Sequence, residues 1–77
     1  MRDPIFRAFK TIEALSRRDG VTTIELADIL GFGGTRQTRY SLGRYWIDMA
    51  SLHYPVVEKG FRVNGTAGRN PVVYGMM

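Results

Sequence analysis

The sequence predicts an α+β domain in which three helices are followed by a small antiparallel β hairpin. Helix-start signals and a glycine-rich turn lie in the first half, whereas β-branched and aromatic runs follow only after Pro55. The chain has 77 residues, of which 44% are hydrophobic and 12% aromatic, enough for one core and typical of a folded globule. We therefore expect a single domain over residues 1–77.

Asp3 and Pro4 predict the start of the first helix. The Asp3 carboxylate can act as N-cap, and proline suits the first helical position, where its missing N–H costs nothing. An apolar stripe follows at helical spacing, made of Ile5, Ala8, Phe9, Ile12, Leu15 and Ser16. We expect this stripe to face the core and the helix to end near Arg18. Phe6 lies beside the stripe, where it either pads the edge of the core or joins a dimer contact.

Thr22 and Glu25 predict the second helix through a capping box, in which each side chain accepts from the other residue's backbone N–H. Val21 and Leu26 are spaced to form the hydrophobic staple that fixes how the chain enters the helix. Gly31 can adopt a positive φ and close the helix. A short helix over these residues is the expectation.

The third helix is expected after the glycine-rich turn Gly31-Phe32-Gly33-Gly34, with either Thr35 or Thr38 as its cap. Its apolar residues share one face, which we expect in the core: Leu42, Tyr45, Trp46, Met49, Leu52 and His53. The opposite face would then carry Arg36, Gln37, Tyr40, Arg44, Ile47 and Ser51, with Arg39 at its flank. Gly43 inside this helix suggests that another backbone comes close there.

The hairpin is predicted after Pro55, which disfavours helical geometry in the residue before it. Strand-like runs are Val56 and Val57, then Phe61 and Val63, then Val72, Val73 and Tyr74. The polar segment 64–71 between them, with two glycines and Arg69, is the expected hairpin tip.

Charge is unevenly divided along the chain. Residues 1–34 hold five basic and five acidic side chains, and residues 35–77 hold six basic and two acidic ones, which accounts for the whole net charge of +4. A basic field concentrated in one half favours a polyanionic partner.

Several function classes have no support in the residues. The absence of cysteine excludes disulfides and thiolate sites, and the single histidine, His53, excludes a multi-histidine metal site. We interpret His53 as a packing or capping residue. No nucleophile–base set, carboxylate pair or phosphate-binding loop is recognisable, so we expect neither an enzyme nor a cofactor. With no apolar run long enough for a membrane span and no signal peptide, we expect a cytoplasmic protein.

The order of elements resembles the winged helix-turn-helix domains of bacterial transcription regulators, particularly the isocitrate-lyase-regulator and multiple-antibiotic-resistance-regulator types. The matching segments are RAFKTIEALSRRDG, VTTIELADILGF, VVEKGFRV and GRNPVVYGM, so the resemblance covers most of the chain. Within the second segment, Ala27 and Gly31 keep the alanine-to-glycine spacing of helix-turn-helix units. The GFGG turn is longer and richer in glycine than the usual corner. We expect a free-standing domain of the phage, plasmid or mobile-element kind.

The resemblance implies sequence-specific binding of double-stranded DNA by a small transcriptional regulator, acting as a homodimer. The third helix would read the major groove, and the basic wing from Arg62 to Asn70 would contact the minor groove or the backbone. The expected DNA-contacting residues are Thr35, Arg36, Gln37, Thr38, Arg39, Tyr40, Arg44, Arg62, Arg69 and Asn70. Two alternatives stay open. The domain could dock on a protein, such as a host partner of a phage or mobile-element protein, or it could bind structured RNA or a left-handed duplex.

Overall fold

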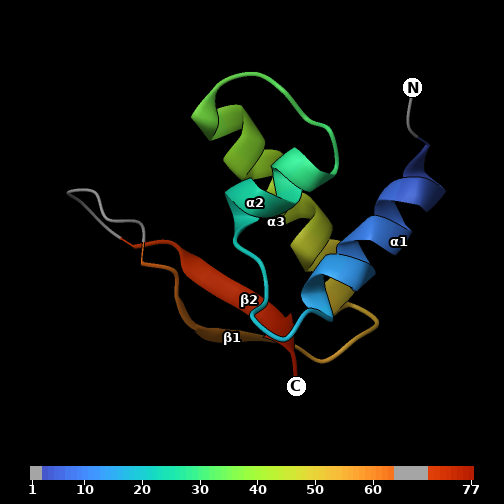
Figure 1. The fold of residues 1–77 in the computed structure, drawn as a ribbon. Helices are drawn as coiled ribbons and strands as arrows, with labels where there is room; N and C mark the ends of the chain where they lie inside the picture. The colour runs from blue at the N-terminus through green and yellow to red at the C-terminus, as the bar shows by residue number, and fades with distance from the viewer. Residues whose placement is uncertain (1–2, 64–69) are drawn as a thin grey trace.

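The computed structural model describes residues 3–63 and 70–77 and confirms the expected order of three helices followed by an antiparallel hairpin (Figure 1). The helices are α1 (Pro4–Leu15), α2 (Thr23–Ile29) and α3 (Arg36–Ser51). The strands are β1 (Val56–Phe61) and β2 (Val72–Met76). The described chain is therefore an α+β domain with the layout of a winged helix.

The predicted helix starts are confirmed by their hydrogen bonds. Asp3 Oδ1 accepts from the Phe6 N–H at 2.7 Å. In the capping box of α2, Thr22 Oγ1 accepts from the Glu25 N–H at 3.2 Å, and Glu25 Oε1 accepts from the Thr22 N–H at 3.1 Å. Gly31 follows α2 with a φ of +85°, as its helix-closing role requires. The first helix ends at Leu15 rather than near Arg18.

The hairpin is joined by a third short segment. β1 and β2 pair antiparallel from Val56 opposite Met76 to Phe61 opposite Val72, with a bulge between Glu58 and Gly60. Val21 and Tyr74 exchange two backbone hydrogen bonds, of 2.9 and 2.8 Å, so the segment before α2 extends the sheet by one bridge. The sheet is thereby tied to the start of α2. Val63, which was predicted to be a strand residue, lies beyond β1.

The core lies where the three helices meet the inner end of the hairpin. Its buried residues come from every helix and from β2. They are Ala14, Leu15, Val21, Leu26, Leu30, Ile47, Ala50 and Tyr74.

The predicted core face of α3 is wrong for most of its residues, although Trp46 is partly buried against the core as expected. Tyr45, Met49 and Leu52 are 54%, 41% and 73% exposed, and His53 is also exposed. The buried residues of α3 are instead Gly43, Ile47 and Ala50, of which Ile47 was expected on the outer face. The reason is a close approach of α2, because a Cβ built on Gly43 would come within 2.9 Å of the Thr23 carbonyl carbon and nearer still to its oxygen. The prediction that a backbone approaches Gly43 is therefore confirmed, and this approach sets the rotation of α3.

The apolar stripe of α1 is buried only at its C-terminal end. Leu15 is fully buried beside Thr11 and Ala14, whereas Ile5 and Phe9 are 69% and 74% exposed. Phe6 is half-buried, with the Lys10 ammonium 5.6 Å from its ring centroid. The N-terminal half of α1 therefore leaves large apolar side chains at the surface.

Candidate nucleic-acid interface

Thr35 begins the third helix. Its Oγ1 accepts from the Thr38 N–H at 3.1 Å and lies 3.0 Å from the Thr38 hydroxyl, so Thr35 is the N-cap and Arg36 the first helical residue. The choice between Thr35 and Thr38 is thereby decided. The side chains of Arg36, Gln37 and Thr38 consequently occupy the first turn of α3.

The glycine-rich corner before α3 is anchored through Phe32. The Phe32 N–H donates to the Ala27 carbonyl at 3.0 Å, and the Arg7 guanidinium lies 4.2 Å from the centroid of the half-buried Phe32 ring. This cation–π contact joins α1 to the corner. Contacts with both α1 and α2 therefore position the corner before α3, despite its three glycines.

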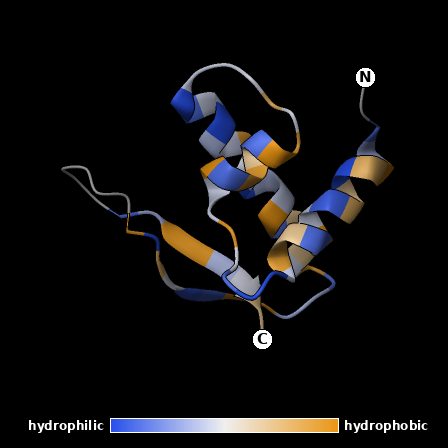
Figure 2. Ribbon diagram, in the orientation of Figure 1, coloured by the Kyte–Doolittle hydropathy of each residue, from blue (hydrophilic) through white to orange (hydrophobic). Residues whose placement is uncertain are grey.

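The first half of α3 presents an open row of polar side chains. Arg36, Gln37, Thr38 and Ser41 are exposed, and Tyr40 is half exposed. A shallow hollow of about 370 Å³ lies among them, lined by Thr35, Gln37, Thr38, Ser41 and Leu42. Figure 2 shows this end of α3 as the hydrophilic end of the helix. Within the described residues Arg36 makes no ion pair, so its guanidinium is available to a ligand.

Arg39 is held against the preceding helix. Its Nη1 lies 2.8 Å from Asp28 Oδ1, its side chain is only 27% exposed, and its Nε is buried without a hydrogen-bond partner in the described structure. Arg39 therefore braces α3 against α2 and presents little of its charge outward.

Arg44 is held against the hairpin. Its Nη1 donates to the Tyr74 hydroxyl, its guanidinium lies 5.4 Å from the Tyr74 ring centroid, and its Nε lies 3.2 Å from Asp48. Burial opposes the charged form, but Tyr74 and Asp48 outweigh it and raise the pKa of Arg44. The charge of Arg44 is thus directed towards β2.

Arg62 bonds to several polar groups around the start of α2. Its Nε and Nη2 donate to the two carboxylate oxygens of Glu25 at 3.0 and 2.9 Å, and its Nη1 lies 3.7 Å from Asp19. The hydrogen bonds to Glu25 raise the pKa of the Arg62 guanidinium. Glu25 therefore caps α2 and fixes the end of β1 with one carboxylate. Arg62, predicted in the wing, is turned to the body of the domain.

The outer end of the hairpin projects from the same side of the domain as the first turns of α3 (Figure 1). The Arg62 N–H donates to the Pro71 carbonyl at 2.9 Å, and Asn70 next to it is exposed. Figure 1 shows the first turns of α3 and the outer end of the hairpin projecting on the side away from α1. Arg69, the other predicted wing contact, lies outside the described residues.

Of the ten predicted DNA-contacting residues, the structure brings one group together as an exposed surface. This open surface consists of Thr35, Arg36, Gln37, Thr38 and Tyr40 on α3. Asn70 is exposed separately, on the hairpin. Three predicted contacts, Arg39, Arg44 and Arg62, are bound to acidic or tyrosine partners instead. Their partners lie 11, 30 and 37 residues away, a separation at which no local pattern in the sequence signals the pairing.

The chain has no match among protein-family models, curated proteins or solved structures. In the part of the chain that the structure describes, no cluster of three or more metal-binding side chains occurs. None of the helices described there has both the length and the apolar character needed to cross a membrane.

Proposed function

We propose that this chain binds double-stranded DNA sequence-specifically as a small transcriptional regulator of the winged helix-turn-helix kind. The first turns of α3 enter the major groove, and the outer end of the hairpin contacts the minor groove or the neighbouring backbone. The observation that carries the proposal is the open surface at the start of α3, where Arg36, Gln37 and Thr38 project from a braced helix.

The side chains of this surface have the chemistry of base-edge recognition. Arginine can donate two hydrogen bonds to guanine O6 and N7, and glutamine can pair with adenine N6 and N7, each good pair contributing about 1–3 kcal/mol of discrimination. Thr38 supplies a short hydroxyl, and Tyr40 supplies a phenol that can bond a phosphate. The first two turns of α3 thus offer both base readers and backbone contacts.

Rigidity supports the same proposal. Arg39 is bonded to Asp28, and Gly43 packs directly on the Thr23 backbone, so α3 is fixed to α2 just behind its exposed turn. A reader held in place loses little conformational entropy on binding. The Arg39–Asp28 pair therefore helps to hold the exposed turn of α3 in position. Arg36 is the cationic side chain that this turn presents to DNA.

A salt titration tests the proposal most directly. Binding of the full chain to random-sequence duplex DNA is measured by fluorescence anisotropy at several salt concentrations. We expect the logarithm of affinity to fall linearly with the logarithm of salt concentration, with a slope of about −0.9 per phosphate contacted. Lack of binding at the lowest salt concentration would remove the proposal.

Variants of Arg36 separate base reading from charge. A preferred sequence is first selected from a random pool. Arg36→Lys keeps the charge but loses the two-pronged geometry, so we expect preference at one base pair to relax while affinity for random duplex is retained. Arg36→Gln removes the charge as well and should weaken binding to every sequence.

The matched control is Arg17→Gln, which makes the same charge change at an exposed arginine beyond the end of α1. It should leave the base preference intact. If Arg36→Lys keeps the full base preference, Arg36 contacts a phosphate, and the bases are read by other side chains of the open surface.

A further inference from the structure

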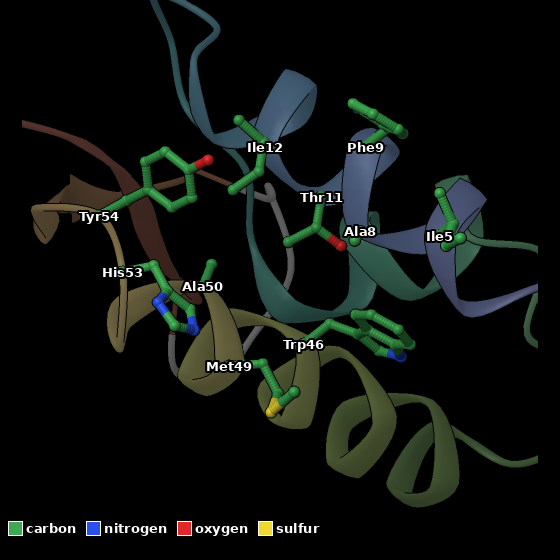
Figure 3. Close-up of a pocket in the computed structure, with 10 residues that line it drawn as sticks. All are labelled: Ile5, Ala8, Phe9, Thr11, Ile12, Trp46, Met49, Ala50, His53 and Tyr54. Carbon is green, nitrogen blue, oxygen red and sulfur yellow. The ribbon is translucent and has the colours of Figure 1, made fainter.

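Large apolar side chains are exposed in more than one part of the domain. One group lines an apolar groove of about 340 Å³ between α1 and the second half of α3. Figure 3 shows the Trp46 side chain reaching from α3 towards α1, and the Tyr54 ring beside Ile12. At the outer end of the hairpin, away from this groove, Phe61 and Val63 are 69% and 82% exposed. This second group belongs to the part of the domain that is proposed to contact DNA.

A β bulge determines which way Phe61 points. Glu58 pairs with Tyr74. Phe61, three residues further along β1, pairs with Val72, only two residues from Tyr74 on β2. Because side chains alternate between the two faces of a strand, the extra residue in β1 moves Phe61 to the face of Tyr74. Gly60 in this bulge has a φ of +129°, a conformation that residues with a side chain rarely adopt. Phe61 and Tyr74 therefore share one face of the hairpin.

The face shared by Phe61 and Tyr74 is turned towards α3. The Tyr74 hydroxyl accepts a hydrogen bond from Arg44 Nη1 on that helix. Arg36, Tyr40 and Arg44 follow one another at intervals of four residues, so they lie along one side of α3. This side leads from the open surface at the start of α3 to the hairpin. Phe61 therefore continues the proposed DNA-contacting surface onto β1.

The charges around Phe61 allow a polyanion to approach. No acidic residue follows Glu58 in the sequence, and Glu58 itself lies opposite Tyr74, further from the outer end of the hairpin than Phe61. Asp48, the other acidic residue after Thr35, lies 3.2 Å from Arg44 and is compensated by it. The outer end of the hairpin thus presents apolar side chains without adding a carboxylate that would repel a phosphate backbone.

We propose that Phe61, with Val63 beside it, inserts between adjacent base pairs in the minor groove and kinks the duplex that α3 reads. Proteins that bind the minor groove frequently insert apolar side chains, phenylalanine among them, between base steps, and the duplex then bends by about 20–90° towards the major groove. Phe61 has the ring, the exposure and the position that this role needs. The inference rests on the proposed DNA binding and adds that the chain also recognises how easily a site deforms.

Insertion of Phe61 would make specificity depend on base stacking. Pyrimidine–purine steps such as TA and CA are easily kinked or unstacked, so a site with such a step opposite Phe61 costs less to bend. We expect sequences selected from a random pool to be enriched in such a step at a fixed spacing from the bases that α3 reads. That step would be recognised without a hydrogen bond to its base edges.

The test measures bending and binding on the same complex. A duplex of about 20 base pairs carries a donor and an acceptor dye at its two ends, and binding of the wild-type chain should raise the energy transfer as the duplex kinks. The fluorescence of 2-aminopurine placed at the kinked step should rise as stacking is lost. In Phe61→Ala both signals should return to those of the straight duplex. Affinity, measured by fluorescence anisotropy, should fall by less than about tenfold, because the lost burial of the ring and the avoided unstacking offset each other.

Two further variants serve as controls. Phe61→Leu keeps an apolar side chain of a kind that other proteins insert, and it should retain the bend. Phe9→Ala makes the same truncation as Phe61→Ala at a phenylalanine that is 74% exposed on α1, and it should bend DNA as the wild-type chain does. Circular dichroism checks that every variant folds.

The outcomes separate this inference from the proposed function. A complex that forms but leaves the duplex straight overturns the insertion, leaves the proposed DNA binding intact and assigns Phe61 and Val63 to a protein partner. Full bending by Phe61→Ala, or loss of bending in Phe9→Ala, also overturns it, because the kink would then not depend on the ring on β1. Absence of binding to any duplex at low salt removes both proposals together.

Discussion

The two neighbours of α3 make opposite kinds of junction with it. Towards α2, the Thr23 backbone packs against Gly43, and Arg39 pairs with Asp28 across the junction. Towards α1, the second half of α3 is separated by an apolar groove with Trp46 partly exposed on its wall. The closed junction fixes the direction of the exposed first turn, whereas the open one leaves apolar side chains exposed. One helix can thus carry two exposed surfaces, because α2 packs closely against it whereas α1 is separated from its second half by a groove.

The largest effect should come from adding one carbon to the closed junction. In a helix interior, Gly→Ala normally stabilises by about 1 kcal/mol. At Gly43 the new Cβ would collide with the backbone carbonyl of Thr23. We therefore expect Gly43→Ala to lower the free energy of unfolding by about 1–3 kcal/mol, measured by urea denaturation.

Two controls bracket this prediction. Gly33→Ala makes the same change in the corner, where a Cβ would meet nothing within 4 Å, and should not destabilise the domain. Ala8→Leu adds three carbons on the exposed wall of the groove and, measured on dilute chain with the groove unoccupied, should change the free energy of unfolding by less than about 0.5 kcal/mol. A large loss in Ala8→Leu would mean that the two junctions are equally closed.

The helix starts and the order of elements could be predicted because their signals are local. Asp3 is identified by the Pro4 that follows it, and Thr22 by the Glu25 three residues on, and both caps bond a backbone N–H within three residues. The burial of α3 could not be predicted in the same way. Large apolar side chains dominate a helical stripe, but tight packing used the small residues Gly43 and Ala50 instead.

The open surface could be predicted only in part, for a related reason. A run of polar residues after Thr35 identifies an exposed helix turn, and Arg36, Gln37 and Tyr40 are exposed there. Which arginines stay free depends on contacts made by the folded chain. The uneven charge along the sequence is also reduced in the fold, because Arg39 and Arg62 pair with Asp28 and Glu25 from the neutral half.

The second prediction concerns the link between the hairpin and the closed junction. Arg62→Lys keeps the charge but cannot bond both Glu25 oxygens in the planar geometry of a guanidinium. Since both side chains are partly exposed, we expect a loss of about 1 kcal/mol in the free energy of unfolding. Urea denaturation measures it against Arg36→Lys, which should stay within about 0.5 kcal/mol. Equal losses would show that the Glu25 pair adds nothing to stability.

The smallest effect on stability should come from Asp28→Asn, which removes the acidic partner of Arg39. The pair is largely at the surface, with Asp28 56% exposed, so we expect less than about 0.5 kcal/mol of destabilisation. Its effect on the proposed DNA binding should be larger, because the freed Arg39 guanidinium lies one turn from Arg36 and can meet a phosphate.

Affinity for random duplex should therefore rise, and the log–log salt dependence should steepen by roughly 0.9 if Arg39 gains one phosphate contact. Asp48→Asn is the matched control, since it makes the same charge change while Tyr74 still holds Arg44. Fluorescence anisotropy compares the two variants. Equal gains in both would show that only net charge matters. A gain in affinity that occurs only in Asp28→Asn would show that the Arg39–Asp28 pair limits the positive charge available at the open surface.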